Sequence, residues 1–403
     1  MSMGKNEGVT PASELLARIA KFQQALQEKG LSGALIIQKT DLFYFASTSQ
    51  QGWLYIPDKG EALLMVFKEY GRAKIESNLA QIVSLVSPKK IPDMLATYGY
   101  VYPSRLGMEL DVLPANLFFQ YQNIFQDATI IDVSYEIRLT RAVKSRYELS
   151  FMRQAAAFSD QVCSKVPEFL EEGQTEIAIA GRVEGYARSL GHQGIVRMRL
   201  WGSELFYGHL MSGASAAVPS YLSSPTGGGG ISPSVGQGAS FNKVARHEPI
   251  LLDYVFAWQG YISDHTRIFS IGGLPDELLQ AHEAMLQIQE AMRRQALPGA
   301  LSGELYEIMT AMAADKGYEK YFMGTGERKI RFTGHGVGLE LDEFPFIAKG
   351  QKLILEEGMV IAFEPKVILP GKGVVGIENT HVVTDSGLER LGHSDDKITF
   401  VNS

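Results

Sequence analysis

The first third of the chain alternates short apolar runs with helical patterns. Apolar side chains recur at three- and four-residue spacing between Leu15 and Leu26, which predicts an amphipathic helix over residues 11–29. Another helix is expected at 113–125. Short apolar strands are predicted at 34–37, 53–56, 62–67, 82–86, 107–110 and 128–133. Strands mixed with helices in this way are typical of an α/β domain.

A charged segment, residues 138–148 (RLTRAVKSRYE), follows these elements. A chain of 403 residues is too long for one compact core, so we place a domain boundary here, between residues 1–140 and residues 141–403. Helices are expected at about 145–166 and 175–190. The first domain has no cluster of histidine, cysteine or paired carboxylates in its sequence. We therefore expect it to shape or cover a site whose chemistry lies in the second domain.

Composition narrows the possible functions. The apolar fraction of 45 % is ordinary for a globular protein, and the net charge of −7 is spread along the chain. No basic run suggests nucleic acid as a partner, and no stretch approaches the roughly 20 apolar residues of a membrane span. The amino terminus lacks the apolar core of a signal peptide. A single cysteine, Cys163, suits a reducing compartment, and we predict a cytoplasmic protein.

The chemistry is concentrated in two predicted hairpins. In the first, Asp253 and Asp264 flank a turn at Trp258-Gln259-Gly260, and antiparallel pairing about that turn makes the two carboxylates face each other. Bare carboxylates so close repel, and a cation between them removes that cost. A pair of exposed strand aspartates is the alternative interpretation of this hairpin.

The second hairpin repeats the arrangement. Its turn, Pro370-Gly371-Lys372, lies midway between Glu364 and Glu378, and the flanking Val and Ile residues predict buried strands in which a glutamate needs a partner. His335 lies between two glycines that allow close backbone approach. Four carboxylates and one imidazole suit two divalent ions such as Mn, Co, Fe or Zn. Two such ions can hold a hydroxide between them as the nucleophile.

Three short motifs around these residues resemble a known family. The segments GYISDHTRIF, GHGVGLE and FEP are similar to those of the pita-bread metallopeptidases, which include methionine aminopeptidase, aminopeptidase P, prolidase and the related creatinase. The resemblance implies an α/β (α+β) fold with a creatinase/prolidase-like N-terminal domain, a pita-bread catalytic domain and a homodimer. It assigns the metal ligands to Asp253, Asp264, His335, Glu364 and Glu378, and it makes Glu364 the general base.

The sequence also departs from that family. Asp342 stands where a second histidine is expected seven residues after His335, and Ser220 and Tyr221 follow Pro219 where another histidine is expected. The arginine often found just before the last glutamate is absent, and Gly376 lies two residues before Glu378. A carboxylate can donate to an oxyanion only when it is protonated. Asp342 would therefore act protonated, or it would bind a substrate amine.

Two other side chains are candidates for the missing donors. His209 could enter the site, although a structural histidine is the slightly simpler interpretation, and Tyr221 could donate its hydroxyl. The leading hypothesis is an Xaa-Pro aminopeptidase or dipeptidase acting on small peptides. The alternatives are a creatinase-like hydrolase or lyase that uses the same metal site on a non-peptide substrate, and a catalytically silent binding homologue.

Overall fold

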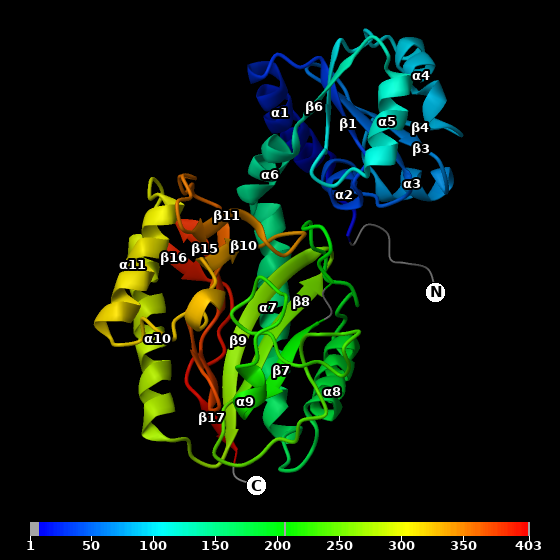
Figure 1. Cartoon of the computed structure of the whole chain (residues 1–403). Coiled ribbons are helices and arrows are strands. Elements are labelled where there is room, and N and C mark those ends of the chain that lie inside the picture. Colours follow the sequence, from blue (N-terminus) through cyan, green and yellow to red (C-terminus); the bar gives the residue numbers. More distant parts are fainter. Residues whose placement is uncertain (1–7, 205–206, 402–403) are drawn as a thin grey trace. The chain divides into compact units, whose positions relative to one another are not determined.

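The computed structural model describes residues 8–204 and 207–401 of the chain. The chain divides into two compact units, of which one ends at Arg141 and the other begins at Ala142. Figure 1 shows the first unit in blue and cyan and the second in green to red.

The first unit is built on a mixed six-stranded sheet in the order β4-β3-β2-β1-β5-β6. The pairs β1–β2 and β2–β3 are antiparallel, whereas β3–β4, β1–β5 and β5–β6 are parallel. Its strands are β1 (Gly33–Ile36), β2 (Gly52–Pro57), β3 (Leu63–Val66), β4 (Gln81–Ser84), β5 (Arg105–Met108) and β6 (Thr129–Asp132). The mixed α/β architecture predicted for this half is therefore present.

Helices supply the rest of the first unit. They are α1 (Ala12–Glu28), α2 (Lys39–Ala46), α3 (Tyr70–Glu76), α4 (Ile91–Thr97), α5 (Ala115–Ile124) and α6 (Ser134–Ala142). The apolar stripe of α1, from Leu15 to Leu26, is fully buried, as its periodicity predicts. Tyr121 of α5 belongs to a buried apolar cluster of this unit that also contains Leu106 and Met108 of β5.

Within the described residues, the second unit contains three sheets. Four strands are ordered β17-β9-β8-β7, five are ordered β11-β10-β12-β15-β16, and β13 pairs with β14. The bounds are β7 (Gly208–Ser212), β8 (Ile250–Trp258), β9 (Tyr261–Ile271), β10 (Phe332–Gly336), β11 (Glu343–Ala348), β12 (Val360–Phe363), β13 (Lys366–Leu369), β14 (Gly373–Gly376), β15 (Asn379–Thr384), β16 (Gly387–Arg390) and β17 (Thr399–Val401).

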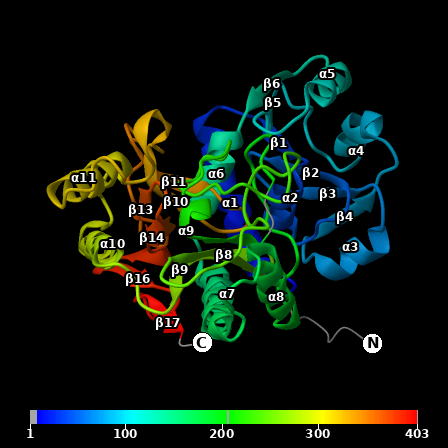
Figure 2. The same ribbon diagram turned by 60° about the horizontal axis from the view of Figure 1, so that its bottom comes forward.

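Long helices cover these sheets on their outer sides. They are α7 (Arg146–Lys165), α8 (Glu176–Ser189), α10 (Asp276–Gln295) and α11 (Ser302–Asp315), and the short α9 (Gly213–Ala216) follows β7. In Figure 2, α7 and α8 lie beside β8 and β9, whereas α10 and α11 lie beside the ribbon of β13 and β14. No helix in the described part of the chain is long and apolar enough to cross a membrane.

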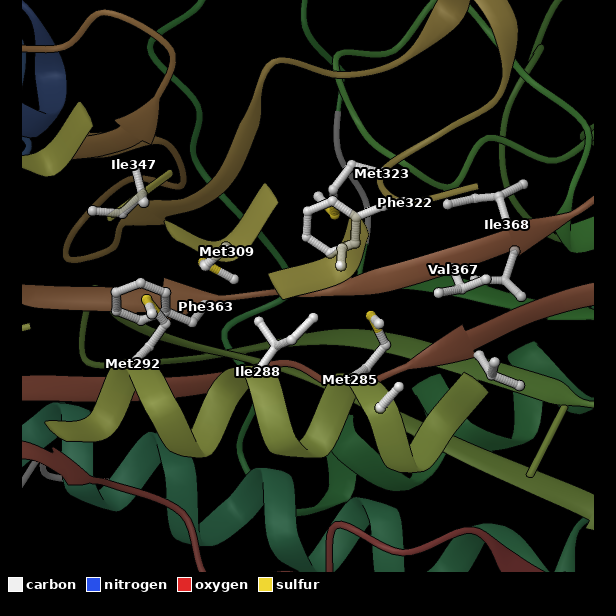
Figure 3. Packing of buried hydrophobic residues seen from close by; sticks show 14 of the residues in the cluster. Met285, Ile288, Met292, Met309, Phe322, Met323, Ile347, Phe363, Val367 and Ile368 are labelled. Carbon is white, nitrogen blue, oxygen red and sulfur yellow. The ribbon is translucent and has the colours of Figure 1, made fainter. Parts of the chain in front are cut away.

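Two of these helices show how the local sequence sets the architecture. Helix α7 begins with a capping box, in which Ser145 accepts from the Glu148 amide and Glu148 accepts from the Ser145 amide. Helix α10 buries Met285, Ile288 and Met292 at helical spacing, and Figure 3 shows these side chains pointing toward the neighbouring strands and helix. Helix α10 therefore packs against the strands through apolar side chains, and the polar chemistry lies on the other side of those strands.

Candidate metal centre

The first carboxylate pair lies on the hairpin of β8 and β9. Its turn has only two residues, Gln259 and Gly260, with φ angles of 52° and 90°, and Trp258 pairs with Tyr261. Positive φ at both positions is the signature of a type I′ turn, whose twist matches that of the strands.

This turn fixes a register that differs from the one predicted. Asp253 pairs with Thr266, and Asp264 pairs with Val255, so the prediction that the two carboxylates face each other directly is wrong. The turn is centred between Gln259 and Gly260 rather than on a three-residue segment, which offsets the two aspartates diagonally. They still share one face of the ladder, because residues two apart point the same way.

The second pair follows the predicted geometry. Phe363 of β12 pairs with Asn379 of β15, and Lys366 of β13 pairs with Gly376 of β14. Both pairs belong to the same register, which places Glu364 opposite Glu378 between the two ladder segments. The two hairpins are joined at this point, because the Thr266 amide donates to the Glu378 carbonyl at 3.2 Å.

His335 comes from β10, which lies between β11 and β12. Its Nε2 lies 3.7 Å from Asp264 Oδ2 and 3.7 Å from Glu378 Oε1. The flanking glycines are required by close strand packing: a Cβ on Gly334 would lie 2.6 Å from the Ala362 carbonyl oxygen, and one on Gly336 would lie 2.2 Å from that of Phe344.

Asp264, His335 and Glu378 form a group that could hold a metal ion. Their ligand atoms all lie within 4.8 Å of one another, and all three side chains are buried. Among the described residues, Asp264 Oδ1 has no hydrogen-bond partner although it is buried. A buried carboxylate oxygen without a donor is costly, and a divalent cation would satisfy it. These three residues therefore fit a metal ion on their own chemistry.

A lysine that the sequence analysis overlooked occupies the other half of the centre. Lys366 Nζ lies 3.0 Å from Asp253 Oδ2, 2.8 Å from Glu364 Oε2 and 2.7 Å from Glu378 Oε2. The signal was present in the sequence, because a lysine two residues after Glu364 in an apolar strand faces the same side as that glutamate. A second divalent ion does not fit among these three carboxylates while the ammonium is there.

The electrostatics follow from burial and crowding. Burial, together with Glu378 and Asp253, raises the pKa of Asp264 well above its usual value. Burial also raises the pKa of Glu364 to about 7, although Lys366 opposes that shift. For Glu378 burial acts in the same direction, but Lys366 and His335 outweigh it and lower the pKa. One glutamate is thus held as an anion, whereas the other is poised to exchange a proton near neutrality.

The remaining candidates surround this centre at different distances. Asp342 has a φ of 62° and places its Oδ1 3.5 Å from His335 Nδ1. His209 of β7 is buried and pairs with Asp253 of β8. Its Nδ1 lies 3.3 Å from Thr226 Oγ1. Tyr221 is 61 % exposed, and its hydroxyl accepts a hydrogen bond from Gln237.

These candidates and the carboxylates line one pocket with a volume of about 280 Å³. Apolar walls come from Met198, Leu200, Trp201, Phe332 and Leu341. Such a volume lies at the lower end of the range for small-molecule sites. The pocket can therefore take a ligand of about dipeptide size beside the carboxylates.

Comparison with known proteins identifies the family. Residues 150–385 match metallopeptidase family M24, and residues 18–143 match the creatinase/prolidase N-terminal domain. The chain belongs to metallopeptidase family M24. Family M24 implies divalent metal cofactors, and both parts of the predicted fold, the creatinase/prolidase-like domain and the pita-bread domain after it, are confirmed.

Individual relatives of this M24 chain align over nearly its whole length. An Xaa-Pro dipeptidase of Pyrococcus furiosus is 28 % identical over 93 % of this chain and 97 % of its own. An uncharacterized peptidase of Bacillus subtilis, YqhT, is 26 % identical over 95 % of this chain and 100 % of its own. The crystal structure of the prolidase from Pyrococcus horikoshii OT3 superimposes with a TM-score of 0.78 at 25 % identity, covering 94 % of this chain and 99 % of that one.

Proposed function

We propose that this M24 protein is a metal-dependent peptidase that releases the first residue from small peptides whose second residue is proline. The observation that carries the proposal is the convergence of Asp253, Asp264, His335, Glu364 and Glu378 at one pocket of dipeptide size. The relatives named Xaa-Pro dipeptidase, aligned over nearly the full chain, support the choice of proline.

In this proposal some side chains bind the metal ion or the substrate, and others transfer protons or donate hydrogen bonds. Asp264, His335 and Glu378 would hold the cation, which supplies Lewis-acid polarisation of the scissile carbonyl. Glu364, opposite Glu378, would accept the proton of the attacking water and pass it to the leaving amine. Asp342, beside His335, would bind the substrate's terminal ammonium. His209 and Tyr221 would donate hydrogen bonds to the developing oxyanion.

A panel of peptides tests this proposal. Protein stripped with EDTA and reloaded with Mn²⁺, Co²⁺, Fe²⁺ or Zn²⁺ should hydrolyse Ala-Pro and Met-Pro, and should leave Ala-Ala and Pro-Ala intact. Ala-Pro-Ala in the same assay separates an aminopeptidase from a strict dipeptidase. Absence of turnover on every Xaa-Pro substrate with every ion would contradict the proposal.

A second candidate function has a specific observation behind it. Asp342 gives the pocket a carboxylate where the family resemblance leads one to expect a histidine, which favours a small non-peptide substrate. Screening amidine, betaine and sulfonium compounds with the same metal-loaded protein distinguishes this creatinase-like hydrolase or lyase from the peptidase. A homodimer is also proposed, and light scattering coupled to gel filtration would check it.

A further inference from the structure

The acidic centre contains one cation that belongs to the chain itself. The three N–H bonds of an ammonium match the three carboxylate oxygens around Lys366, which come from Asp253, Glu364 and Glu378 at 2.7–3.0 Å. We propose that the Lys366 ammonium permanently takes the place of one of the two divalent ions, so that the centre binds a single ion at Asp264, His335 and Glu378. This refines the metal site on which the proposed function rests.

The lysine side chain is confined to this position. It is fully buried, and its ion pairs to the three carboxylates are the only ones the structure gives it within the described residues. On the neighbouring strand, its register partner is Gly376. A Cβ on Gly376 would lie 2.7 Å from Lys366 Cα and 3.1 Å from Lys366 Cγ, so the glycine leaves room for the lysine stem.

The residues that pair between β13 and β14 also bear on this proposal. The family resemblance leads one to expect an arginine just before the last glutamate, and Gly376 lies in that stretch instead. The residue paired with Gly376 is the lysine. In this chain the basic side chain of the ribbon therefore comes from β13, and its ammonium reaches the carboxylates.

The position of the ammonium supports one divalent ion rather than two. A second divalent ion would have to share Asp253, Glu364 and Glu378 with an ammonium already within hydrogen-bond distance of all three. Cations so close repel strongly in a buried site, where screening by water is weak.

The remaining ligands are arranged for one ion. Glu378 uses Oε2 for the lysine, whereas its Oε1 lies toward His335 Nε2. Asp264 Oδ1 has no hydrogen-bond partner among the described residues, and Asp264 Oδ2 lies toward the same imidazole. Three protein ligands with open positions are typical of a catalytic rather than a structural metal site. Glu378 would thus bridge the ion and the ammonium.

Metal stoichiometry tests this inference without reference to any substrate. Stripped protein is dialysed to equilibrium against Mn²⁺ or Zn²⁺, and bound metal is measured by mass spectrometry with inductively coupled plasma. One ion per chain is expected for the natural protein. Two ions per chain, or none, would overturn the inference. For the Mn²⁺ form, paramagnetic resonance should give the spectrum of an isolated ion, and a spin-coupled pair would likewise overturn it.

Variants of the lysine sharpen the result. Lys366→Ala removes the ammonium and should raise the stoichiometry from one ion to two, whereas Lys366→Arg keeps the charge and should stay at one. An alanine variant that still binds one ion would contradict the role of the ammonium. If the alanine variant does not fold, the count and the resonance spectrum of the natural protein still decide. One bound ion without Xaa-Pro hydrolysis would count against the proposed function but not against this inference.

Discussion

The hairpin of β8 and β9 and the ribbon that runs from β12 to β15 each deliver two carboxylates to the same centre, but they compensate the charge differently. The ribbon carries Lys366, which ion-pairs with both of its glutamates. On the hairpin the same ammonium reaches only Asp253, and Asp264 keeps a buried oxygen with no hydrogen-bond partner in the described part of the chain. Three of the four carboxylates are thus paired with an ammonium of the chain itself, whereas Asp264 keeps an oxygen that a bound cation would satisfy.

The largest expected difference between the two regions is the loss of activity on substituting Asp264. Asp264→Asn removes an anionic ligand, and we expect kcat/KM on Ala-Pro to fall on the order of 10³-fold, because the loss of metal polarisation costs several kcal/mol. Metal content should fall with it. The matched control is Asp385→Asn, which changes an exposed aspartate in the turn after β15 and should leave both quantities as they are. An Asp264→Asn variant with near-natural activity would remove the distinction between the hairpins.

In the metal-free protein, one substitution in each region should change the free energy of unfolding in opposite directions. Lys366→Met leaves the buried Glu364 and Glu378 and the partly buried Asp253 without their cation, and we expect the free energy of unfolding to fall by about 3–5 kcal/mol. Asp264→Asn relieves a carboxylate whose charged form is disfavoured by burial and by its neighbours, so it should stabilise the metal-free protein, by about 0.5–2 kcal/mol.

Chemical denaturation of EDTA-treated protein measures both changes. Because a chain with two compact units need not unfold in a single transition, the comparison uses the transition that responds to added metal. Equal losses of stability in the two variants would show that the carboxylates of hairpin and ribbon are compensated alike.

The same two regions show how far sequence reasoning reaches. The glutamate pair could be predicted, because the turn at Pro370-Gly371-Lys372 centres the register correctly on Gly371. The aspartate pair was placed on the right face but in the wrong register, since Gln259 gives no sign in the sequence of adopting a positive φ. Periodicity fixes which face a strand residue occupies, whereas the turn geometry fixes which residue it meets.

Lys366 was missed for a different reason. Pattern reasoning treats a lysine in an apolar strand as an edge or surface residue, because a buried ammonium is costly. Only the three-dimensional arrangement shows that three carboxylates from two hairpins offset that cost. In the first unit, by contrast, helices α1 and α5 and the six short strands follow from apolar periodicity, and no long-range polar contact was needed to predict them.

Acid should destabilise the contacts that His192 makes with Gly194 and with Val255 of β8. His192 accepts from the Gly194 amide through Nδ1 and lies 3.1 Å from the Val255 carbonyl through Nε2, so only the neutral ring satisfies both contacts. Burial lowers its pKa from 6.5 to about 4. The unfolded chain binds a proton that the folded chain excludes. This contribution to stability is therefore complete above pH 6.5 and is lost as the pH falls toward 4.

The expected loss is at most about 3 kcal/mol, because each pKa unit corresponds to 1.36 kcal/mol. Denaturation curves between pH 7.5 and 4 measure it, and His192→Gln should flatten the pH dependence. His393→Gln, at an exposed site, is the matched control and should keep the natural slope. If the His192 variant kept that slope as well, the acid sensitivity would have to come from other groups.

The smallest expected effect concerns the turns that set the two registers. Gln259 holds a φ of 52°, a conformation that asparagine adopts more readily, and Asn-Gly is the favoured pair for a type I′ turn. Gln259→Asn should therefore raise the free energy of unfolding by about 0.5–1 kcal/mol without altering activity. In the second turn the positive φ of 75° already falls on Gly371, so Lys372→Asn should bring no such gain. Matched denaturation curves of the two variants would show whether the gain is confined to the first turn. A gain at both turns would mean that asparagine acts through the unfolded chain or the surface rather than through the left-handed conformation that offsets Asp253 from Asp264.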